Sequence, residues 1–255
     1  MLLVSSFAAS GVLWTWQNRV RIREERSRKK QLETMLDEGM QIALALAKHE
    51  AASRNQPMAA IHILAALTQD ESVAAALEIL CADRAGLEAA LDAALEAAVD
   101  PREADRDPRD GTKLLGTALG IAHAQQRTMT CTDALAVLLR SPVATLLDRP
   151  PVTGDALLFQ LVHGAVPPAT LPRESHVHVV LRNDDYTAMQ LVVHVLETTF
   201  ALPSARAIEL MRAVHEAGRA VIGRYSVAEA HDKVLAARAL ARSTHSPLWI
   251  GVEVC

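Results

Sequence analysis

The sequence predicts two domains, an all-α helical bundle followed by a small α+β domain with three antiparallel strands and three helices. The chain of 255 residues is long enough to build two cores of ordinary size. Apolar residues recur every three or four positions through the first two thirds of the chain, which is typical of amphipathic helices. After a proline-rich stretch, "HVHVVLR" at 176–182 alternates as an edge strand or a half-buried strand does.

The composition excludes several classes of function. Apolar residues make up 50% of the chain and aromatic residues only 3%, so the cores consist mainly of Ala, Leu and Val, as in packed helices. The net charge of -4 provides no positive field for a nucleic acid, and we expect none as a partner. Cys81, Cys131 and Cys255 lie far apart without metal-ligand spacing, so we expect reduced thiols in the cytoplasm and no metal or other cofactor.

The first 30 residues bear on where the chain resides. Residues 1–16 carry no charge, whereas residues 19–30 hold seven Arg or Lys and two Glu. Because the basic residues follow the apolar run, their order is opposite to that of a secretory signal. By the positive-inside rule, 1–16 is a candidate anchor in the inner membrane with the rest of the chain in the cytoplasm, although ~20 residues are needed to span a bilayer squarely. The alternatives are an apolar helix end or a wrongly assigned start codon.

Residues 31–165 form the predicted helical domain. Helices are expected from about 33 to 98, with a break near Ala82 and Asp83, and again from Thr112. Between them, "DPREADRDPRDG" has the prolines and alternating charges of a solvated linker. The stretch "QIALALAKHEAASRNQPMAAIHILAALTQDESVAAAL" can be laid over "KLLGTALGIAHAQQRTMTCTDALAVLLRSPVATLL" with the same order of helices. This internal repeat predicts a bundle of two units related by a pseudo-twofold axis.

The repeat resembles the N-terminal domain of the Clp (Hsp100) unfoldases, in which a Leu-rich helix and a polar turn precede a helix like "IHILAAL" at 61–67. The resemblance covers residues 33–165. His62 also fits the ordinary role of a packed histidine near a helix start. The loop GxxxxGK[ST], whose backbone amides cradle phosphates in the unfoldase motors, does not occur in the sequence, so we expect no motor activity.

A connector at 166–174, rich in proline, leads to the predicted α+β domain at 175–255. Strands are expected at 176–182, 219–226 and 246–254, and helices at 187–200, 203–218 and 227–243. The distinctive motifs of this segment are "NDDYT" at 183–187, Met189, "LMRAVH" at 210–215, Gly218, "GRYS" at 223–226, Lys233 and "HSPLW" at 245–249. In these motifs the segment resembles the ClpS adaptors, without a gap from Val179 to Glu253.

The resemblance to ClpS implies an adaptor that binds proteins by a bulky N-terminal residue (Leu, Phe, Tyr or Trp) and delivers them to a ClpAP-type protease. It implies that Asn183, Asp184 and His215 bind the α-ammonium and that Thr187 contacts the neighbouring backbone. The implied pocket for the first side chain consists of Met189, Val192, Met211, Val214 and Leu248. In the family, the methionine that matches Met189 acts as a gate against β-branched residues.

Physical chemistry supports this reading and also offers plainer ones. An ammonium has three donors, and an amide oxygen next to a carboxylate provides acceptors for them. However, "NDD" before a helix is also typical of an N-cap with acids in the first turn. Met189 and Met211 taken singly would likewise pass for core residues.

Docking on the unfoldase N-terminal domain is implied for Lys233, but Ala228 stands where the family commonly has an acid. Ala188 and Arg212 replace a usual proline and a usual apolar residue. Because no GxSxG or HExxH motif occurs, we expect no enzyme. The expected function is the adaptor that the resemblance to ClpS implies. The first alternative is a regulator or decoy in which the Clp N-like domain covers the adaptor's docking face. The second is a chaperone-like scaffold with a vestigial pocket.

Overall fold

The computed structural model describes residues 32, 34–80, 82–97, 110–149, 152–164 and 176–254. The candidate anchor at 1–16, the connector at 166–174 and most of the expected linker at 100–111 lie outside these ranges, as do Cys81 and Cys255. Among the described residues, no helix combines the length and apolar character that crossing a membrane requires. We call residues 32–164 the helical region and residues 176–254 the α+β domain.

The helical region contains two series of helices in the same order. The first series is α2 (Glu38–Ser53), α3 (Ala60–Leu67), α4 (Glu71–Ile79) and α5 (Arg84–Ala97). The second series is α6 (Asp110–Ala124), α7 (Cys131–Leu138), the 3-10 helix η2 (Pro142–Leu147) and α8 (Gly154–His163). The expected break near Ala82 and Asp83 is confirmed. Helix α6 begins at Asp110, two residues before the expected Thr112.

The short central helix of each series begins with the same kind of cap. In α3, the N–H of Ala59 donates to Nδ1 of His62 at 3.1 Å, and in α7 the N–H of Thr130 donates to a carboxylate oxygen of Asp133 at 2.7 Å. His62 is buried, and its Nε2 donates to the side chain of Gln56 at 2.9 Å. Burial lowers the pKa of His62, which keeps Nδ1 free of a proton and able to accept. His62 is therefore a packed, capping histidine.

An ion pair joins the end of α6 to the start of α7. The guanidinium of Arg127 contacts both oxygens of Asp133, at 2.6 and 2.7 Å, and the Asp133 side chain is fully buried. Arg127 reaches this place because α6 ends in a Schellman turn. In this turn Gln126 has a φ of 54°, and the N–H of Arg127 donates to the carbonyl of Ala122 at 3.2 Å.

The α+β domain has the order of strands and helices expected from the sequence. It consists of β1 (His176–Arg182), α9 (Met189–Phe200), α10 (Ser204–Ala217), β2 (Arg219–Ser226), α11 (Val227–Arg242) and β3 (Trp249–Val254). Both strand pairings are antiparallel, and the order β2-β1-β3 puts β1 in the middle. The edge-strand alternative for 176–182 is therefore wrong, because neighbours pair with β1 on both sides. Its alternation is real, since Val177, Val179 and Leu181 lie in the core under the helices.

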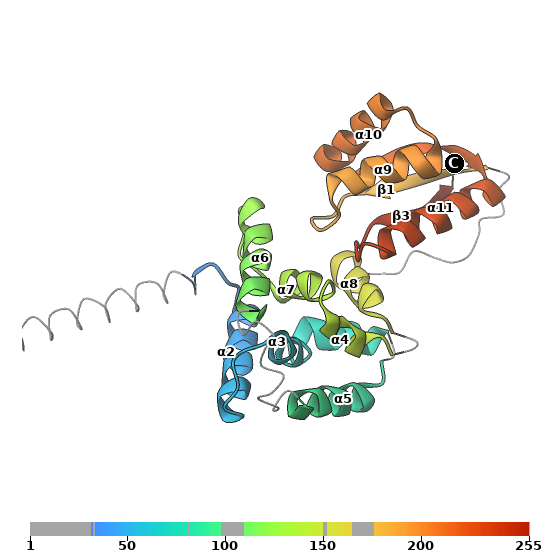
Figure 1. Ribbon diagram of the computed structural model, residues 1–255. Helices are drawn as coiled ribbons and strands as arrows, with labels where there is room; N and C mark the ends of the chain where they lie inside the picture. The colour runs from blue at the N-terminus through green and yellow to red at the C-terminus, as the bar shows by residue number, and fades with distance from the viewer. Residues whose placement is uncertain are drawn as a thin grey trace, which may run out of the picture.

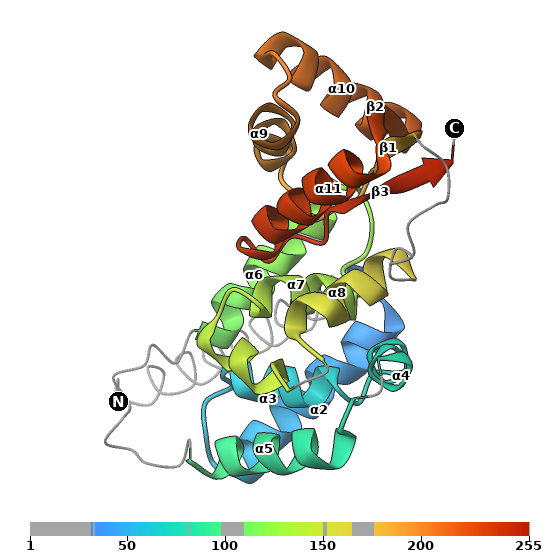
Figure 2. The same ribbon diagram turned by 90° about the vertical axis from the view of Figure 1, so that its right-hand side faces the viewer.

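The two parts of the chain have separate hydrophobic cores. One core is built from buried residues between Leu36 and Leu158, the other from buried residues between Val177 and Ile250. In both views, α7 and α8 lie between the first series of helices and the α+β domain (Figures 1 and 2). The second series is thus the side of the helical region that meets the α+β domain.

We expect Asp133→Asn to lower the free energy of unfolding of the helical region by about 3 kcal/mol. The value is at the lower end for a broken buried ion pair, because Arg127 keeps partial access to water. Urea unfolding followed by circular dichroism measures the loss. Asp92→Asn, on the exposed side of α5, is the matched control and should change stability by less than about 0.5 kcal/mol.

The same substitution should alter the response to acid. Burial raises the pKa of Asp133, but the hydrogen bonds from Arg127 and Thr130 outweigh burial and hold that pKa below its usual value. Such a carboxylate contributes stability that is complete above its unfolded pKa of about 3.9 and is lost as the pH falls through the folded value. The difference between wild type and variant should therefore shrink below about pH 4. A difference that stays constant into acid would contradict this account.

Candidate functional site

The loop at 183–187 joins β1 to α9, and hydrogen bonds to the side chain of Asp184 fix its conformation. One oxygen of Asp184 accepts from the N–H of Tyr186 at 2.8 Å and of Thr187 at 2.6 Å. The other oxygen accepts from the hydroxyl of Thr187 at 2.8 Å. This is the turn that short polar side chains form with nearby backbone. Asp184 thus orders the loop. The alternative that "NDD" is an N-cap with first-turn acids is wrong, because α9 starts after Ala188, with no side-chain cap and no acid in its first turn.

Asn183 is held at the end of α10. Its N–H donates to the carbonyl of Gly218 at 2.8 Å, and Gly218 ends α10 in the left-handed conformation with a φ of 77°. A side chain is disfavoured in that conformation, so a glycine at this position follows from the backbone. His215 lies in the last turn of the same helix. One main-chain bond thereby joins the start of the loop, at Asn183, to the C-terminal cap of the helix that carries His215.

A pocket of about 210 Å³ opens beside this loop. The nine residues predicted for the ammonium, the neighbouring backbone and the first side chain all line it, from the loop, α9, α10 and the segment before β3. They are Asn183, Asp184, Thr187, Met189, Val192, Met211, Val214, His215 and Leu248. Leu181, Arg182 and Asp185 also line it, and so does Gln125 from the helical region.

Exposure divides the pocket into a floor and a mouth. Val214 and Leu248 are buried in the core of the α+β domain, whereas Met189 is 46% exposed. A flexible thioether at the first position of α9 therefore lies at the mouth, where it can move. The polar residues of the loop line the same hollow as these apolar side chains. This arrangement suits a ligand with one apolar group next to one polar or charged group.

Lys233 does not line the pocket. Its ammonium on α11 donates to the carbonyl of Thr199 at 3.0 Å, and it lies 5.7 and 5.6 Å from the ring centres of Phe200 and Tyr225. Glu229 is 4.0 Å away on the same helix. Lys233 thus joins α11 to the end of α9. It lies on a different part of the domain from the loop residues that line the pocket.

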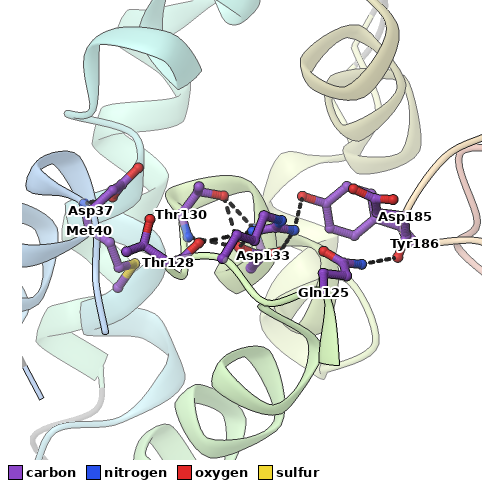
Figure 3. Close-up of polar contacts among 9 residues, drawn as sticks. Asp37, Met40, Gln125, Thr128, Thr130, Asp133, Asp185 and Tyr186 are labelled. Carbon is purple, nitrogen blue, oxygen red and sulfur yellow. Dashed lines mark hydrogen bonds and ion pairs between the residues drawn. The ribbon is translucent and has the colours of Figure 1, made fainter. Parts of the chain in front are cut away.

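The helical region contacts the pocket loop directly. Gln125 donates from Nε2 to the carbonyl of Asp185 at 2.8 Å, and the ring of Tyr186 packs on the core of the helical region (Figure 3). Burial and the nearby Asp133 raise the pKa of Tyr186 to about 12, so the phenol stays neutral. Its oxygen lies 3.5 Å from the guanidinium of Arg127.

A second contact lies at the turn before β3. His163 donates from Nε2 to the carbonyl of Pro247 at 2.6 Å, and Nδ1 of His245 lies 2.9 Å from a carboxylate oxygen of Asp155 on α8. Burial lowers the pKa of His163, which favours its neutral form. The two parts of the chain are therefore joined at two separate places.

Two residues of this site gave little signal in the sequence. Tyr186 belongs to the quoted motif "NDDYT", but its role in packing on the helical region depends on a contact between residues far apart in the chain. Gln125 follows a helix end in an unremarkable polar turn, and no local pattern distinguishes it from Gln126. Within the described ranges, no group of three or more His, Cys, Asp or Glu side chains is placed to hold a metal ion.

The fold and the pocket define a small recognition domain that suits a ligand with one apolar group. The family model for "ATP-dependent Clp protease adaptor protein ClpS" matches residues 172–251. Proteins named "ATP-dependent Clp protease adapter protein ClpS" from Salmonella paratyphi B and Salmonella newport are each 40% identical over 102 residues, which is 40% of this chain and 95% of each relative. The chain therefore belongs to the ClpS family.

A solved structure is also similar. It is titled as Agrobacterium tumefaciens ClpS2 bound to L-phenylalaninamide and is 30% identical, covering 32% of this chain and 98% of that chain with a TM-score of 0.31. The family model begins at residue 172, so the helical region lies before it.

Proposed function

We propose that this chain is an adaptor that recognises proteins by a bulky hydrophobic N-terminal residue, namely Leu, Phe, Tyr or Trp, and delivers them to a ClpAP-type protease. The observation that carries the proposal is the apolar pocket of about 210 Å³ that opens beside the polar loop at 183–187. An N-terminal residue with a bulky side chain offers an apolar group and a cation on the same carbon atom, which matches the two sides of this pocket.

The size of the pocket supports a single side chain as its occupant. Sites for drug-sized ligands usually measure about 300–1,000 Å³, and this pocket is smaller. Burying a Leu or Phe side chain contributes about 1.5–3 kcal/mol. Met189 at the mouth supports selection by shape, because a side chain branched at Cβ would be widest where the thioether lies.

The charged end of the ligand would face Asn183, Asp184 and His215. The amide oxygen of Asn183 and a ring nitrogen of His215 are acceptors for an ammonium. Asp184 already accepts three hydrogen bonds within the loop, but a carboxylate has about four acceptor positions, which leaves one for the ammonium. Each charge-assisted bond contributes about 1.5–3 kcal/mol before entropy costs, so micromolar affinity or better is expected together with the apolar contact.

Delivery to the protease is proposed from family membership, with Lys233 on α11 as the docking residue. Ala228 leaves α11 without the family's usual acid, and Glu229 is the nearest carboxylate. We further propose that the helical region is a Clp N-like double repeat. The repeated order of helices and the matching caps at His62 and Asp133 support this.

The regulator alternative requires the helical region to cover the docking face. The polar contacts described between the two parts instead involve the loop at 183–187 and the turn at 245–247. Lys233 contacts residues of its own domain. These contacts favour an adaptor with its docking residue outside the interface.

Peptide binding tests the proposed recognition. Fluorescence anisotropy of the full chain should show micromolar or tighter binding of peptides that begin with Leu or Phe. Acetylated Leu peptide should bind at least tenfold more weakly, because it has lost the cation. Peptides that begin with Val or Ala should also be weaker, by shape and by lost apolar area. Equal binding of all these peptides, or of none, would refute N-terminal recognition.

Asp184→Asn separates the charge of this residue from its role in the loop. The amide oxygen can still accept from the N–H groups of Tyr186 and Thr187, so the loop should keep its fold. We expect binding of the Leu peptide to weaken about tenfold through the lost charge. Asp232→Asn on the exposed side of α11 removes the same charge elsewhere and should leave affinity unchanged. An unchanged affinity in Asp184→Asn would mean that Asp184 only orders the loop.

Degradation assays distinguish adaptor from regulator. With a ClpAP-type protease, the full chain should accelerate breakdown of a folded reporter that begins with Leu and leave one that begins with Ala unaffected. Lys233→Ala should reduce the acceleration without changing peptide affinity, because Lys233 does not line the pocket. If the full chain instead inhibited the degradation that an added conventional ClpS promotes, the result would support the decoy alternative.

A further inference from the structure

A second hollow adjoins the pocket. It measures about 470 Å³ and lies between the α+β domain and the helical region. Asn183, Asp184 and Asp185 line both hollows, so this part of the loop is a wall that the two share. From the helical region the second hollow is lined by Arg127, Thr130, Thr132, Leu161 and Val162. We call it the interdomain groove.

The helical region also contributes to the pocket itself. Gln125 lines the pocket and donates from Nε2 to the carbonyl of Asp185. Its Oε1 is buried without a hydrogen-bond partner among the described residues, and an unpaired buried acceptor costs about 1–3 kcal/mol. A small movement of the carboxamide would let a peptide N–H arriving beside it supply the missing donor.

We infer that the helical region completes the substrate site: when the first residue of a substrate occupies the pocket, the residues that follow it lie in the interdomain groove. This inference rests on the proposed function. The observation that carries it is that the pocket and the groove are continuous, because Asn183, Asp184 and Asp185 line both. The groove is more than twice as large as the pocket and has room for more than one residue.

The chemistry of the groove suits a peptide main chain better than an anion. Asp184 and Asp185 give it two carboxylates, and the hydroxyls of Thr130 and Thr132 add further polar groups. The positive charge of Arg127 is already engaged by Asp133. Main-chain N–H groups provide donors for such a surface, and Leu161 and Val162 provide apolar contact. Acidic side chains directly after the first residue should therefore be disfavoured.

Photo-cross-linking tests the path of the peptide without any change to the protein. The probe is a peptide that begins with Leu and carries benzoylphenylalanine at its third position, bound to the full chain and analysed by mass spectrometry. We expect adducts on residues 125–132 or 161–162 of the helical region, and excess unlabelled Leu peptide should abolish them. Adducts confined to residues 176–254 would overturn the inference.

A steric variant gives a second, independent readout. Thr132→Trp fills the groove from the first turn of α7, and Thr117→Trp, at an exposed position of α6, is its control. Relative to leucinamide, which reaches only the pocket, a five-residue Leu peptide should lose at least tenfold in affinity in Thr132→Trp and nothing in Thr117→Trp. An unchanged ratio would overturn the inference while leaving the proposed function in place. If neither probe binds the wild type, the proposed function fails and the inference fails with it.

Discussion

The hydrogen bonds of the Asp184 carboxylate are the interaction on which the arrangement of the site depends. By taking the N–H groups of Tyr186 and Thr187, Asp184 folds a short loop tightly between β1 and α9. In that fold Asn183 and Thr187 line the pocket, while Tyr186 packs on the core of the helical region. Without the turn, nothing local would hold this loop in the conformation that places some of its residues in the pocket and Tyr186 against the helical region.

Much of the α+β domain could be predicted because its patterns are local. The alternation at 176–182, the left-handed Gly218 and the helical spacing after Met189 each reflect backbone and burial within a few residues. The nine predicted site residues line one pocket. They could be predicted as a group because the resemblance to ClpS links residues that are far apart in the sequence. The central place of β1 was open from the alternation alone, since a half-buried strand alternates in the same way at an edge and in the middle of a sheet.

What the sequence could not predict are contacts between distant segments. Gln125 reaches Asp185 and His163 reaches Pro247 across 60 and 84 positions of the chain. No periodicity or motif encodes such distances, because they depend on how two finished domains meet. The capping role of His62 could be read in part from its place near a helix start. The buried pair of Arg127 and Asp133 could not, because it depends on a Schellman turn whose left-handed residue is Gln126, not glycine.

The packing of Tyr186 on the helical region couples ligand binding in the pocket to the association of the two domains. The loop that would close around an N-terminal residue is also a surface on which the helical region rests. By thermodynamic reciprocity, a ligand that makes this loop more rigid strengthens the association of the two domains. Association of the domains strengthens ligand binding by the same free energy. A ligand that holds this loop from the pocket would therefore also strengthen the contact between the α+β domain and the helical region.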